Sequence, residues 1–589
     1  MPVLHPGLIF NLLLVLVFFS MNSMADEDSL RHPAAGPIKG QADANGALSW
    51  RGIPYAQPPV GALRWKAPRA LKPFGTVFDA AHFGDMCTQL GTPLLDIDPS
   101  LYGKAIGSED CLTLNIWSPP TPAMTDEGSR PLPVMVWIHG GSNVGGSSSL
   151  YYGGNLAMEQ AVVVVSINYR LGLLGFFSHP ALREAARSEL DKSSNFGILD
   201  IVQSLKWIRE NISAFGGDPS NVTLFGESAG AMNTVTLLYS PLGKGLFHKA
   251  IVQSGNLRQT PVKVAEQFTD DDRSEFSSSE TAAKILLNRG AAETQERARE
   301  MVAELDNPAF IQLMNSASDD ELIGTYTLDI GARIRVPQCI PDGIAIPEGS
   351  PWTLIADAQK VHKVPVILGS NRDEMKFFLG LSPAYVTIVP GSSIQIHDVQ
   401  RYNLHARYLS DRWTTLGVDE LALRLSTHNP DVFAYRFDWD EQPSYPRADF
   451  KEFFGAAHTM EIPFVFNDFD GMKAFAYHFT EQNRIEREQL AERMGEYWSE
   501  FAYTGKPGKG RSGMLPQWPS WGAGNKLLLD AESDGGIRPQ QDVLTMKSIY
   551  DRFLADDSFA SPEEKAAFYQ AMFRGREAWE SYFLPQLAE

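Results

Sequence analysis

The chain is poor in cysteine, in positive charge and in long apolar segments. Lys and Arg number 51 against 71 Asp and Glu, so that the formal net charge is −20. An acidic surface argues against nucleic acid and anionic membranes as partners, because phosphate groups are bound by clustered Lys and Arg. No internal repeat stands out, and hydrophobic residues make up 43% of the sequence. This composition is typical of a globular protein with a large core.

One apolar run stands apart at the N-terminus. Residues Leu8 to Phe19 are apolar except for Asn11, and no charged side chain precedes Asp26. A run of about 12 residues is short for a bilayer span, which takes about 20. It fits the hydrophobic part of a secretory signal, followed by the small-x-small sequence Ser23-Met24-Ala25 as its cleavage site. We therefore expect residues 1–25 to be a signal peptide and the protein to be secreted or periplasmic, with no stable membrane insertion after cleavage. The alternative is an N-terminus kept as a membrane tether.

The three cysteines suggest one disulfide and one free thiol in an exported protein. Cys87 and Cys111 are the near pair and would close a loop of 25 residues. A bridge of that length stabilises a protein by roughly 3 kcal/mol in the chain-entropy model. Cys339 is expected to be a small buried hydrophobic residue and not a nucleophile.

Short β-branched runs alternate with helical patterns along the chain, which predicts a mostly parallel sheet covered by helices on both faces. A helical stripe runs from Ile198 to Ile208, and another helical pattern covers Ala231 to Tyr239. The predicted strands are Pro133–Ile138, Ala161–Asn168, Val222–Phe225, Lys249–Gln253, Val364–Leu368 and Val432–Trp439. Phe268 to Glu280 and Lys506 to Met514 read as surface loops, and Pro562 to Trp579 as a C-terminal helix. We expect one α/β domain over residues 26–589 with insertions and a C-terminal helical extension.

The most informative motif lies between a predicted strand and a predicted helix. It is the pentapeptide Gly226-Glu227-Ser228-Ala229-Gly230. A sharp strand-to-helix turn of this kind raises the central hydroxyl above the edge of a sheet and leaves room only for small flanking residues. The pattern is the nucleophile elbow of acyl-transfer enzymes, and it needs partners elsewhere in the chain.

A serine nucleophile needs a general base and an acid that orients the base, and in this fold the chain order is Ser, then Asp or Glu, then His. Asp373 and Glu374 both follow the predicted strand Val364–Leu368, at the position where catalytic groups gather in such sheets. Position alone leaves both acids open.

Five histidines follow these acids in the sequence. His458 lies in a loop after small residues and before the apolar run from Ile462 to Phe466, which would anchor it. The other four, His397, His405, His428 and His478, lie in polar or helical surroundings. We therefore favour His458 as the base.

An oxyanion hole built from backbone N–H groups is the remaining requirement. The run His139-Gly140-Gly141-Ser142 follows a predicted strand and matches the His-Gly-Gly type of lipases and esterases. His139 precedes the serine, so a packing role suits it better than the role of base.

Together these segments resemble the type-B carboxylesterases, the cholinesterase-like branch of the α/β-hydrolase fold. The resemblance runs from about Ile38 to Trp521. The segments that carry it, besides the elbow, are Arg51 to Ala56 with Pro58-Pro59, Ser108 to Trp117, Asn168 to Gly172, Phe215 to Pro219, Gln253-Ser254-Gly255 and Trp518-Pro519.

The resemblance implies an α/β-hydrolase fold with a central, mostly parallel sheet and large insertions around an active-site gorge. It implies a triad of Ser228, Glu374 and His458, with Glu374 rather than Asp373 as the acid. The oxyanion donors would be the N–H groups of Gly141, Ser142 and Ala229, and Cys87–Cys111 would be the family's first disulfide.

Three residues depart from the family's frequent glycines, namely Ser142 in the oxyanion loop, Met375 after the acid and Thr459 after the histidine. None of the three removes a catalytic group. Cholinesterases carry an indole in the first disulfide loop to bind a quaternary ammonium group. Between Cys87 and Cys111 the only aromatic residue is Tyr102, which argues against cholinesterase activity.

We therefore expect a serine hydrolase that cleaves small neutral carboxylic esters through an acyl-enzyme, with no metal or organic cofactor. The alternatives within the same chemistry are a lipase and a specialised xenobiotic esterase or amidase. A remoter alternative is a cholinesterase-like binding module without activity. The sequence does not fix the oligomeric state.

Overall fold

The computed structural model describes residues 29–120, 130–268, 276–326, 328–329, 333–334, 336–389 and 393–573. The predicted signal segment, residues 1–25, lies outside these ranges. Within them, no helix combines the length and the apolar character needed to cross a membrane.

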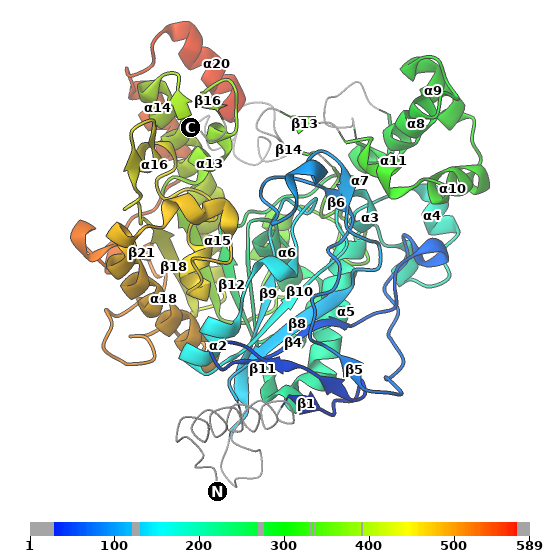
Figure 1. Ribbon diagram of the computed structural model, residues 1–589. Helices are drawn as coiled ribbons and strands as arrows, with labels where there is room; N and C mark the ends of the chain where they lie inside the picture. Colours follow the sequence, from blue (N-terminus) through cyan, green and yellow to red (C-terminus); the bar gives the residue numbers. More distant parts are fainter. Residues whose placement is uncertain are drawn as a thin grey trace, which may run out of the picture.

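One mixed sheet of 11 strands forms the centre of the molecule (Figure 1). The seven neighbouring strands from β21 to β10 pair in parallel, and the flanking strands at both edges pair antiparallel. In sheet order the strands are β22 (Arg538–Gln541), β21 (Asn525–Leu529), β18 (Val432–Phe437), β15 (Val366–Asn371), β12 (Lys249–Gln253), β11 (Gly217–Glu227), β9 (Leu132–Ile138), β10 (Val163–Ile167), β8 (Thr113–Ser118), β4 (Leu48–Pro54) and β3 (Gln41–Ala42).

Both faces of this sheet are covered. Along β9, Val134, Val136 and Ile138 belong to one hydrophobic core, whereas Met135 and Trp137 belong to another. Alternate residues of a strand point to opposite faces, so these two cores lie on the two sides of the sheet. Every residue of β10 and β12 is buried, as expected for parallel strands with helices on both sides. The runs of apolar residues in the sequence therefore mark the middle of the sheet.

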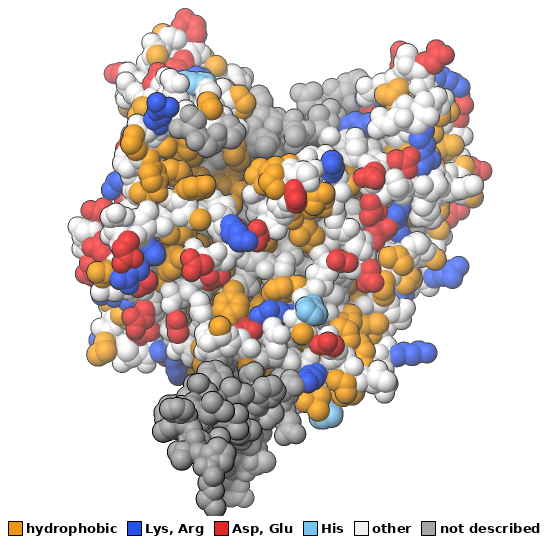
Figure 2. All heavy atoms as spheres, in the orientation of Figure 1, with side chains coloured by type: hydrophobic (Ala, Val, Ile, Leu, Met, Phe, Trp, Pro, Cys, Tyr) orange, Lys and Arg blue, Asp and Glu red, His pale blue; other side chains and the backbone are white. Residues whose placement is uncertain are grey.

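The covering helices come from different parts of the chain. Helices α5 (Phe196–Asn211) and α6 (Ala229–Tyr239) pack into the core that holds Val136, and α17 (Ile462–Phe466) and α18 (Arg484–Thr504) pack into the core that holds Trp137. Two groups of helices project beyond the sheet as lobes (Figure 1). One contains α8 (Ser278–Asn288), α9 (Gln295–Ala303), α10 (Asn307–Asn315) and α11 (Asp319–Ile323), and the other contains α13 (Glu374–Gly380), α14 (Val399–Thr414), α19 (Met546–Ala555) and α20 (Pro562–Phe573). The face drawn in Figure 2 is hollowed between these two lobes, and hydrophobic side chains gather along the lower side of the lobe that carries α14.

Most of the predicted elements are present with shifted ends. Strand β12 has the predicted bounds, and β11 starts five residues earlier than predicted, at Gly217. The prediction of a surface loop through Glu280 is wrong at its end, because α8 begins at Ser278. There the Ser277 side chain accepts a hydrogen bond from the Glu280 N–H, so a serine-rich stretch caps a helix. The rest of that predicted loop, residues 269–275, and the last residues of the predicted C-terminal helix, 574–579, lie outside the described ranges.

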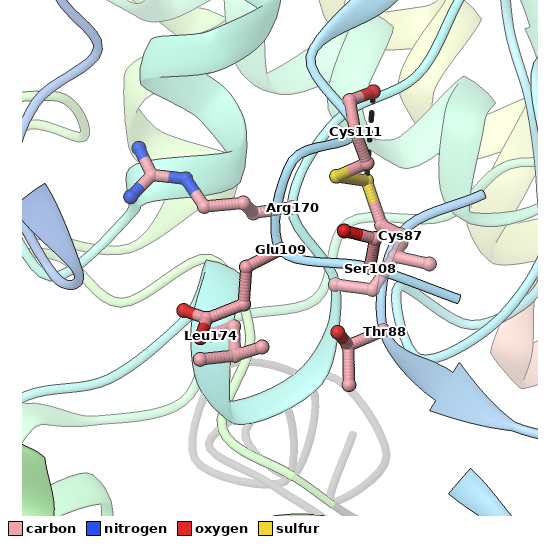
Figure 3. Close-up of a pocket in the computed structure, with 8 residues that line it drawn as sticks. Cys87, Thr88, Ser108, Glu109, Cys111, Arg170 and Leu174 are labelled. Atoms are coloured by element: carbon pink, nitrogen blue, oxygen red, sulfur yellow. Dashed lines mark hydrogen bonds between the residues drawn. A yellow bond between two sulfur atoms is a disulfide. The ribbon is translucent and has the colours of Figure 1, made fainter. Parts of the chain in front are cut away.

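Cys87 and Cys111 form a disulfide, and Cys339 is a free, buried thiol. A cavity of about 10 Å³ lies beside the disulfide and is lined by Cys87, Thr88, Ser108, Glu109, Cys111, Arg170, Leu171 and Leu174 (Figure 3). That volume holds at most one water molecule, so the cavity is no substrate site. Two ion pairs anchor the surroundings: Arg64 holds Glu109, and Arg170 holds the buried Asp200 of α5 at 2.8 Å.

The junction of β9, β11 and α6 leaves no room for side chains at two glycines. A Cβ atom on Gly226 would lie 2.6 Å from the carbonyl oxygen of Ile138, and a Cβ atom on Gly230 would lie 1.8 Å from the same oxygen. The backbone of α6 therefore rests directly on the end of β9. Glycine is required at these positions by close approach.

We expect Gly230→Ala to lower the free energy of unfolding by about 3 kcal/mol, because the added methyl group overlaps backbone atoms that cannot move independently. Gly75→Ala is the matched control, since a Cβ atom there meets nothing within 4 Å. Denaturant unfolding of both variants measures the difference. Equal stability of the two variants would contradict the close packing of the junction.

Candidate active site

Ser228 stands between β11 and α6 in a backbone conformation that few residues adopt. Its φ and ψ angles are 55° and −119°. Its N–H donates to the Gln253 carbonyl at 2.9 Å, and its own carbonyl accepts from the Met232 N–H at 2.9 Å. Strain of this kind persists where the surrounding structure imposes it, and it gathers at functional sites. The turn thus holds the serine at the carboxyl end of a central strand.

Glu374 and His458 meet beside this turn. Glu374 opens α13 just after β15, and its Oε2 atom lies 2.5 Å from His458 Nδ1. The other carboxylate oxygen accepts a hydrogen bond from the Asn371 N–H at 2.8 Å. Both side chains are buried. The carboxylate is therefore fixed from two sides and holds one edge of the imidazole ring.

The neighbouring acid, Asp373, faces elsewhere. Its carboxylate pairs with Arg372 at 2.9 Å and accepts from the Ala456 N–H at 3.1 Å. The alternative histidines also have other partners: His397 contacts Thr387, His405 contacts Tyr385, His428 contacts the Ile355 carbonyl, and His478 contacts Gln442.

The second ring nitrogen of His458 faces Glu227. Nε2 lies 3.0 Å from Glu227 Oε1, and that oxygen has no hydrogen-bond partner among the described residues. In the described part of the chain, no hydrogen bond joins the Ser228 hydroxyl to His458. A Cβ atom on Gly140 would lie 2.7 Å from Glu227 Oε2 and 3.2 Å from Ser228 Cβ. The loop that carries Gly140 therefore lies against both residues.

Three buried carboxyl groups surround this one imidazole: Glu227, Glu374 and Glu461. Burial lowers the pKa of His458, but the charges of Glu227 and Glu374 outweigh burial and raise this pKa to about 9. Burial raises the pKa of Glu227 well above its usual range and that of Glu461 to about 7. The histidine therefore favours its charged form in this resting arrangement, while Glu227 and Glu461 favour protonation.

Neutral amides connect the carboxyl groups. The Asn371 side chain donates to Glu461 Oε2 at 2.6 Å and to the Ala457 carbonyl at 2.7 Å, and the Gln253 side chain donates to Glu461 Oε1 at 3.3 Å. Sequence reasoning did not identify Glu227, Glu461 or Asn371 as site residues. A usable signal existed for two of them, because Glu227 lies within the pentapeptide and Glu461 follows His458 by three residues.

The loop after β9 turns three successive residues into the left-handed region. Gly141, Ser142 and Asn143 have φ angles of 96°, 56° and 55°. The Gly141 carbonyl accepts from the N–H groups of Val144 and Gly145, both at 3.0 Å. Since the carbonyl and N–H of a trans peptide point in opposite directions, the Ser142 N–H points away from those donors.

A second peptide of this loop is fixed in the same way. The Gly140 carbonyl lies 2.9 Å from His139 Nδ1, so the Gly141 N–H points away from the histidine. Burial lowers the pKa of His139 to about 4, and its ring stacks on Tyr169. Among the described residues none accepts a hydrogen bond from the N–H of Gly141, Ser142 or Ala229. Ala229 begins α6, where the first N–H groups have no partner within the helix.

Aromatic side chains surround His458 on the remaining sides. The ring centroids of Phe377, Phe378 and Trp413 lie 6.0, 5.2 and 4.9 Å from the imidazole. The Trp413 N–H donates to the Ser254 carbonyl at 3.2 Å. All three rings are half-buried. No pattern in the sequence marked these residues, because they join from α13 and α14 only in the folded chain.

One acidic group within the described ranges has the spacing of metal ligands: Asp440, Glu441 and Asp534. Arg372 and Lys451 lie 2.6 and 3.0 Å from the Asp440 carboxylate. The Asp440 carboxylate is thus already paired with two cationic side chains. The group includes none of Ser228, Glu374 and His458.

The arrangement at Ser228 holds the groups that acyl transfer needs: a hydroxyl on a strained turn, an imidazole tied to a carboxylate, and backbone N–H groups without partners. A family model described as the carboxylesterase family matches residues 28–403 and 395–542 of this chain. The chain is 34% identical over 529 residues to the para-nitrobenzyl esterase of Bacillus subtilis (strain 168), covering 84% of this chain and 94% of that protein. It is 32% identical over 511 residues to the cocaine esterase of Homo sapiens, covering 80% and 82% of the two chains.

A solved structure of a PNB esterase superposes with a TM-score of 0.64 at 31% identity, covering 89% of this chain and 99% of that one. The mixed sheet with helices on both faces is accordingly the α/β-hydrolase fold. The chain belongs to the carboxylesterase family and is a carboxylic ester hydrolase of type B.

Proposed function

We propose that Ser228 attacks the ester carbonyl, that His458 takes the serine proton and passes it to the leaving alcohol, and that Glu374 orients His458. Water activated by His458 then releases the acid from the acyl-enzyme. The observation that carries this proposal is the 2.5 Å contact between Glu374 and His458 Nδ1. With Nδ1 held in this way, Nε2 faces Glu227, the residue before Ser228. The proposed substrates are small neutral esters, and the acidic net charge argues against nucleic acid as a partner.

The N–H groups of Gly141, Ser142 and Ala229 are proposed to hold the oxyanion. In support, none of the three has an acceptor among the described residues, and the Gly140 and Gly141 carbonyls are bonded on the opposite side. Donors fixed in advance toward developing negative charge stabilise the transition state without reorganisation. Ser142 stands where the family often has a third glycine, and its N–H can donate in the same way. Its positive φ angle is less favourable for serine than for glycine.

His458 must be neutral to accept the serine proton. Because the charges of Glu227 and Glu374 raise the pKa of His458 to about 9, the charged ring is favoured at neutral pH in this arrangement. Glu227, which burial drives toward its protonated form, can take up that proton, because its Oε1 lies 3.0 Å from Nε2. A protonated Glu227 no longer raises the pKa of His458. We therefore assign Glu227 the role of setting the protonation of the base.

We also propose that residues 1–25 are a secretory signal and that residues 26–589 form one domain with a C-terminal helical extension. The Cys87–Cys111 disulfide supports export, because disulfides persist in oxidising compartments. A secreted or periplasmic location follows from this proposal.

Substitutions at Glu374 and Asp373 distinguish the two adjacent acids. With p-nitrophenyl acetate, butyrate and octanoate, we expect Ser228→Ala to lose several orders of magnitude in kcat and Glu374→Gln to lose about 10²- to 10⁴-fold. Asp373→Asn is the matched control and is expected to stay within about threefold of wild type, because Asp373 pairs with Arg372. A larger loss in Asp373→Asn than in Glu374→Gln would reverse the assignment of the acid.

Glu227 should set the position of the acidic limb in the pH profile of kcat/KM. Activity rises with pH as His458 loses its proton, so a raised pKa places this limb at higher pH. Glu227→Gln removes a charge that raises the pKa, and we expect the limb to move to lower pH by about one unit or more. The measurement is the pH at which the limb lies between pH 5 and 10. It does not depend on the maximum value of kcat/KM. A limb that stays in place or moves to higher pH contradicts the role given to Glu227.

The proposed signal segment, residues 1–25, should be removed on export. The mature protein recovered outside the cytoplasm should begin at Asp26, as intact mass spectrometry can determine. Ala25→Asp replaces the small residue at the cleavage site, and we expect it to accumulate as the uncut precursor. An exported wild-type protein that retains Met1 would argue for an N-terminal membrane tether.

A further inference from the structure

The oxyanion loop and the helix after the serine are joined by a pair of buried side-chain amides. Asn143 Nδ2 donates to Asn233 Oδ1 at 3.2 Å, and Asn233 Nδ2 donates to Asn143 Oδ1 at 2.8 Å. Both side chains are fully buried. The Tyr169 hydroxyl lies 3.1 Å from Asn143 Oδ1 and 2.8 Å from the His139 carbonyl, which adds a third connection to the same loop.

The two asparagines lie beside the proposed oxyanion donors. Asn143 follows Ser142 directly, and Asn233 lies one turn into the helix that Ala229 begins. The pair therefore links the two chain segments that must supply N–H groups to one oxygen atom. Within the described residues, no hydrogen bond joins either amide to the serine hydroxyl or the imidazole, so any effect on catalysis would act through the backbone segments that the pair joins.

Asn143 is also held through its backbone. Its φ angle is 55°, and its carbonyl accepts from the Gly172 N–H at 2.6 Å. The carbonyl of Ser142 accepts a hydrogen bond from the Gln338 side chain. Gln338 is in turn fixed by Thr260 through two hydrogen bonds of 3.0 Å. Each peptide of the left-handed stretch thus has a specific polar partner.

The physical consequence is a directional constraint. A left-handed non-glycine residue costs of order 1–3 kcal/mol and persists only when its surroundings fix it. Apolar packing could fill the same volume, but it would tolerate small rotations of the loop. A reciprocal amide pair sets both distance and direction, and breaking it leaves a buried polar group unsatisfied. The loop can therefore not turn without losing these bonds.

We propose that Asn143 and Asn233 are positioning residues that set the relative placement of the Gly141 and Ser142 N–H groups and the Ala229 N–H group. This inference rests on the oxyanion hole proposed above. It adds the side-chain pair that aligns the loop with the start of α6. Neither asparagine touches substrate. Their effect is expected in the transition state, where the oxyanion exists, and not in the binding of the intact ester.

The test uses variants that avoid new strain. Asn233→Leu keeps the side-chain shape within α6, and Asn143→Gly removes the amide while glycine accepts the positive φ angle. The matched control is Asn429→Leu. Asn429 is also a buried asparagine with bonds to backbone atoms, at the Val364 carbonyl and the Asp431 N–H, but it lies ahead of β18, at the opposite end of the strands from Ser228. Thermal unfolding of each variant separates loss of fold from loss of alignment.

With p-nitrophenyl butyrate, we expect each single variant to lower kcat by roughly 10- to 100-fold while KM changes less than about threefold, since small misplacements of catalytic groups have effects of this size. The inhibition constant of a trifluoromethyl ketone, whose adduct with serine carries an oxyanion, should rise in proportion to the loss of kcat/KM. The double variant Asn143→Gly with Asn233→Leu should be little worse than the worse single variant, because the pair acts as one unit.

Three results would overturn the inference while leaving the proposed function intact: kcat of Asn233→Leu equal to that of Asn429→Leu, a loss confined to KM, or fully multiplicative effects in the double variant. Failure of the proposed function looks different. In that case the wild type shows no hydrolysis that Ser228→Ala removes, and the asparagine variants have no activity to lose.

Discussion

The contact between the end of β9 and the start of α6 is the constraint on which the site depends. The Ile138 carbonyl leaves no space for a side chain on Gly230 or Gly226, so two backbone segments meet without side chains between them. The same strand end continues into the loop that holds Gly141 and Ser142. One close approach therefore sets the height of Ser228 above the sheet and the distance from the serine to the proposed oxyanion donors. A larger residue at either glycine would push the two segments apart. It would therefore change both the height of Ser228 and its distance from the proposed donors.

Around this fixed frame, the site must accommodate more negative charge than it can neutralise. Glu227, Glu374 and Glu461 are buried around a single imidazole, and a fully ionised cluster of this kind would carry a large desolvation cost. Uncharged donors bind two of the three carboxyl groups: the side-chain amides of Asn371 and Gln253 donate to Glu461, and the Asn371 backbone N–H donates to Glu374. The raised pKa values of Glu227 and Glu461 follow from the same burial. The 3.0 Å separation of His458 Nε2 and Glu227 Oε1 is the contact on which the proposed proton transfer between them depends.

The sequence predicted the parts of this structure that obey local rules. Runs of β-branched residues marked the central strands because a parallel sheet buries both of its faces, and the glycines of the pentapeptide marked the turn because of their close approach. Local patterns could not choose between Asp373 and Glu374, which are adjacent and chemically alike. The choice came from the family resemblance. In the folded chain Arg372 binds Asp373, and His458 contacts Glu374. Nor could they reveal Phe377, Phe378 and Trp413 around the imidazole, or the Asn143–Asn233 pair. Such contacts join residues far apart in sequence, and no period or spacing encodes them. The loop predicted around Glu280 was wrong for the opposite reason, because a serine-rich stretch also caps helices.

The oxyanion loop shows how strain and polar bonding are balanced in this fold. Three successive residues with positive φ angles would relax if only apolar contacts held them, because dispersion forces depend weakly on orientation. Hydrogen bonds to Asn233, Gly172 and Gln338 act instead at defined angles on successive groups of the loop. A glycine at position 142 would remove part of the strain but also part of the rigidity, since glycine has the widest conformational freedom. Ser142 and Asn143 thus make the loop more costly to form and more sharply defined once formed. That combination suits the role proposed for the loop, which is to hold two N–H groups still while negative charge develops on one oxygen.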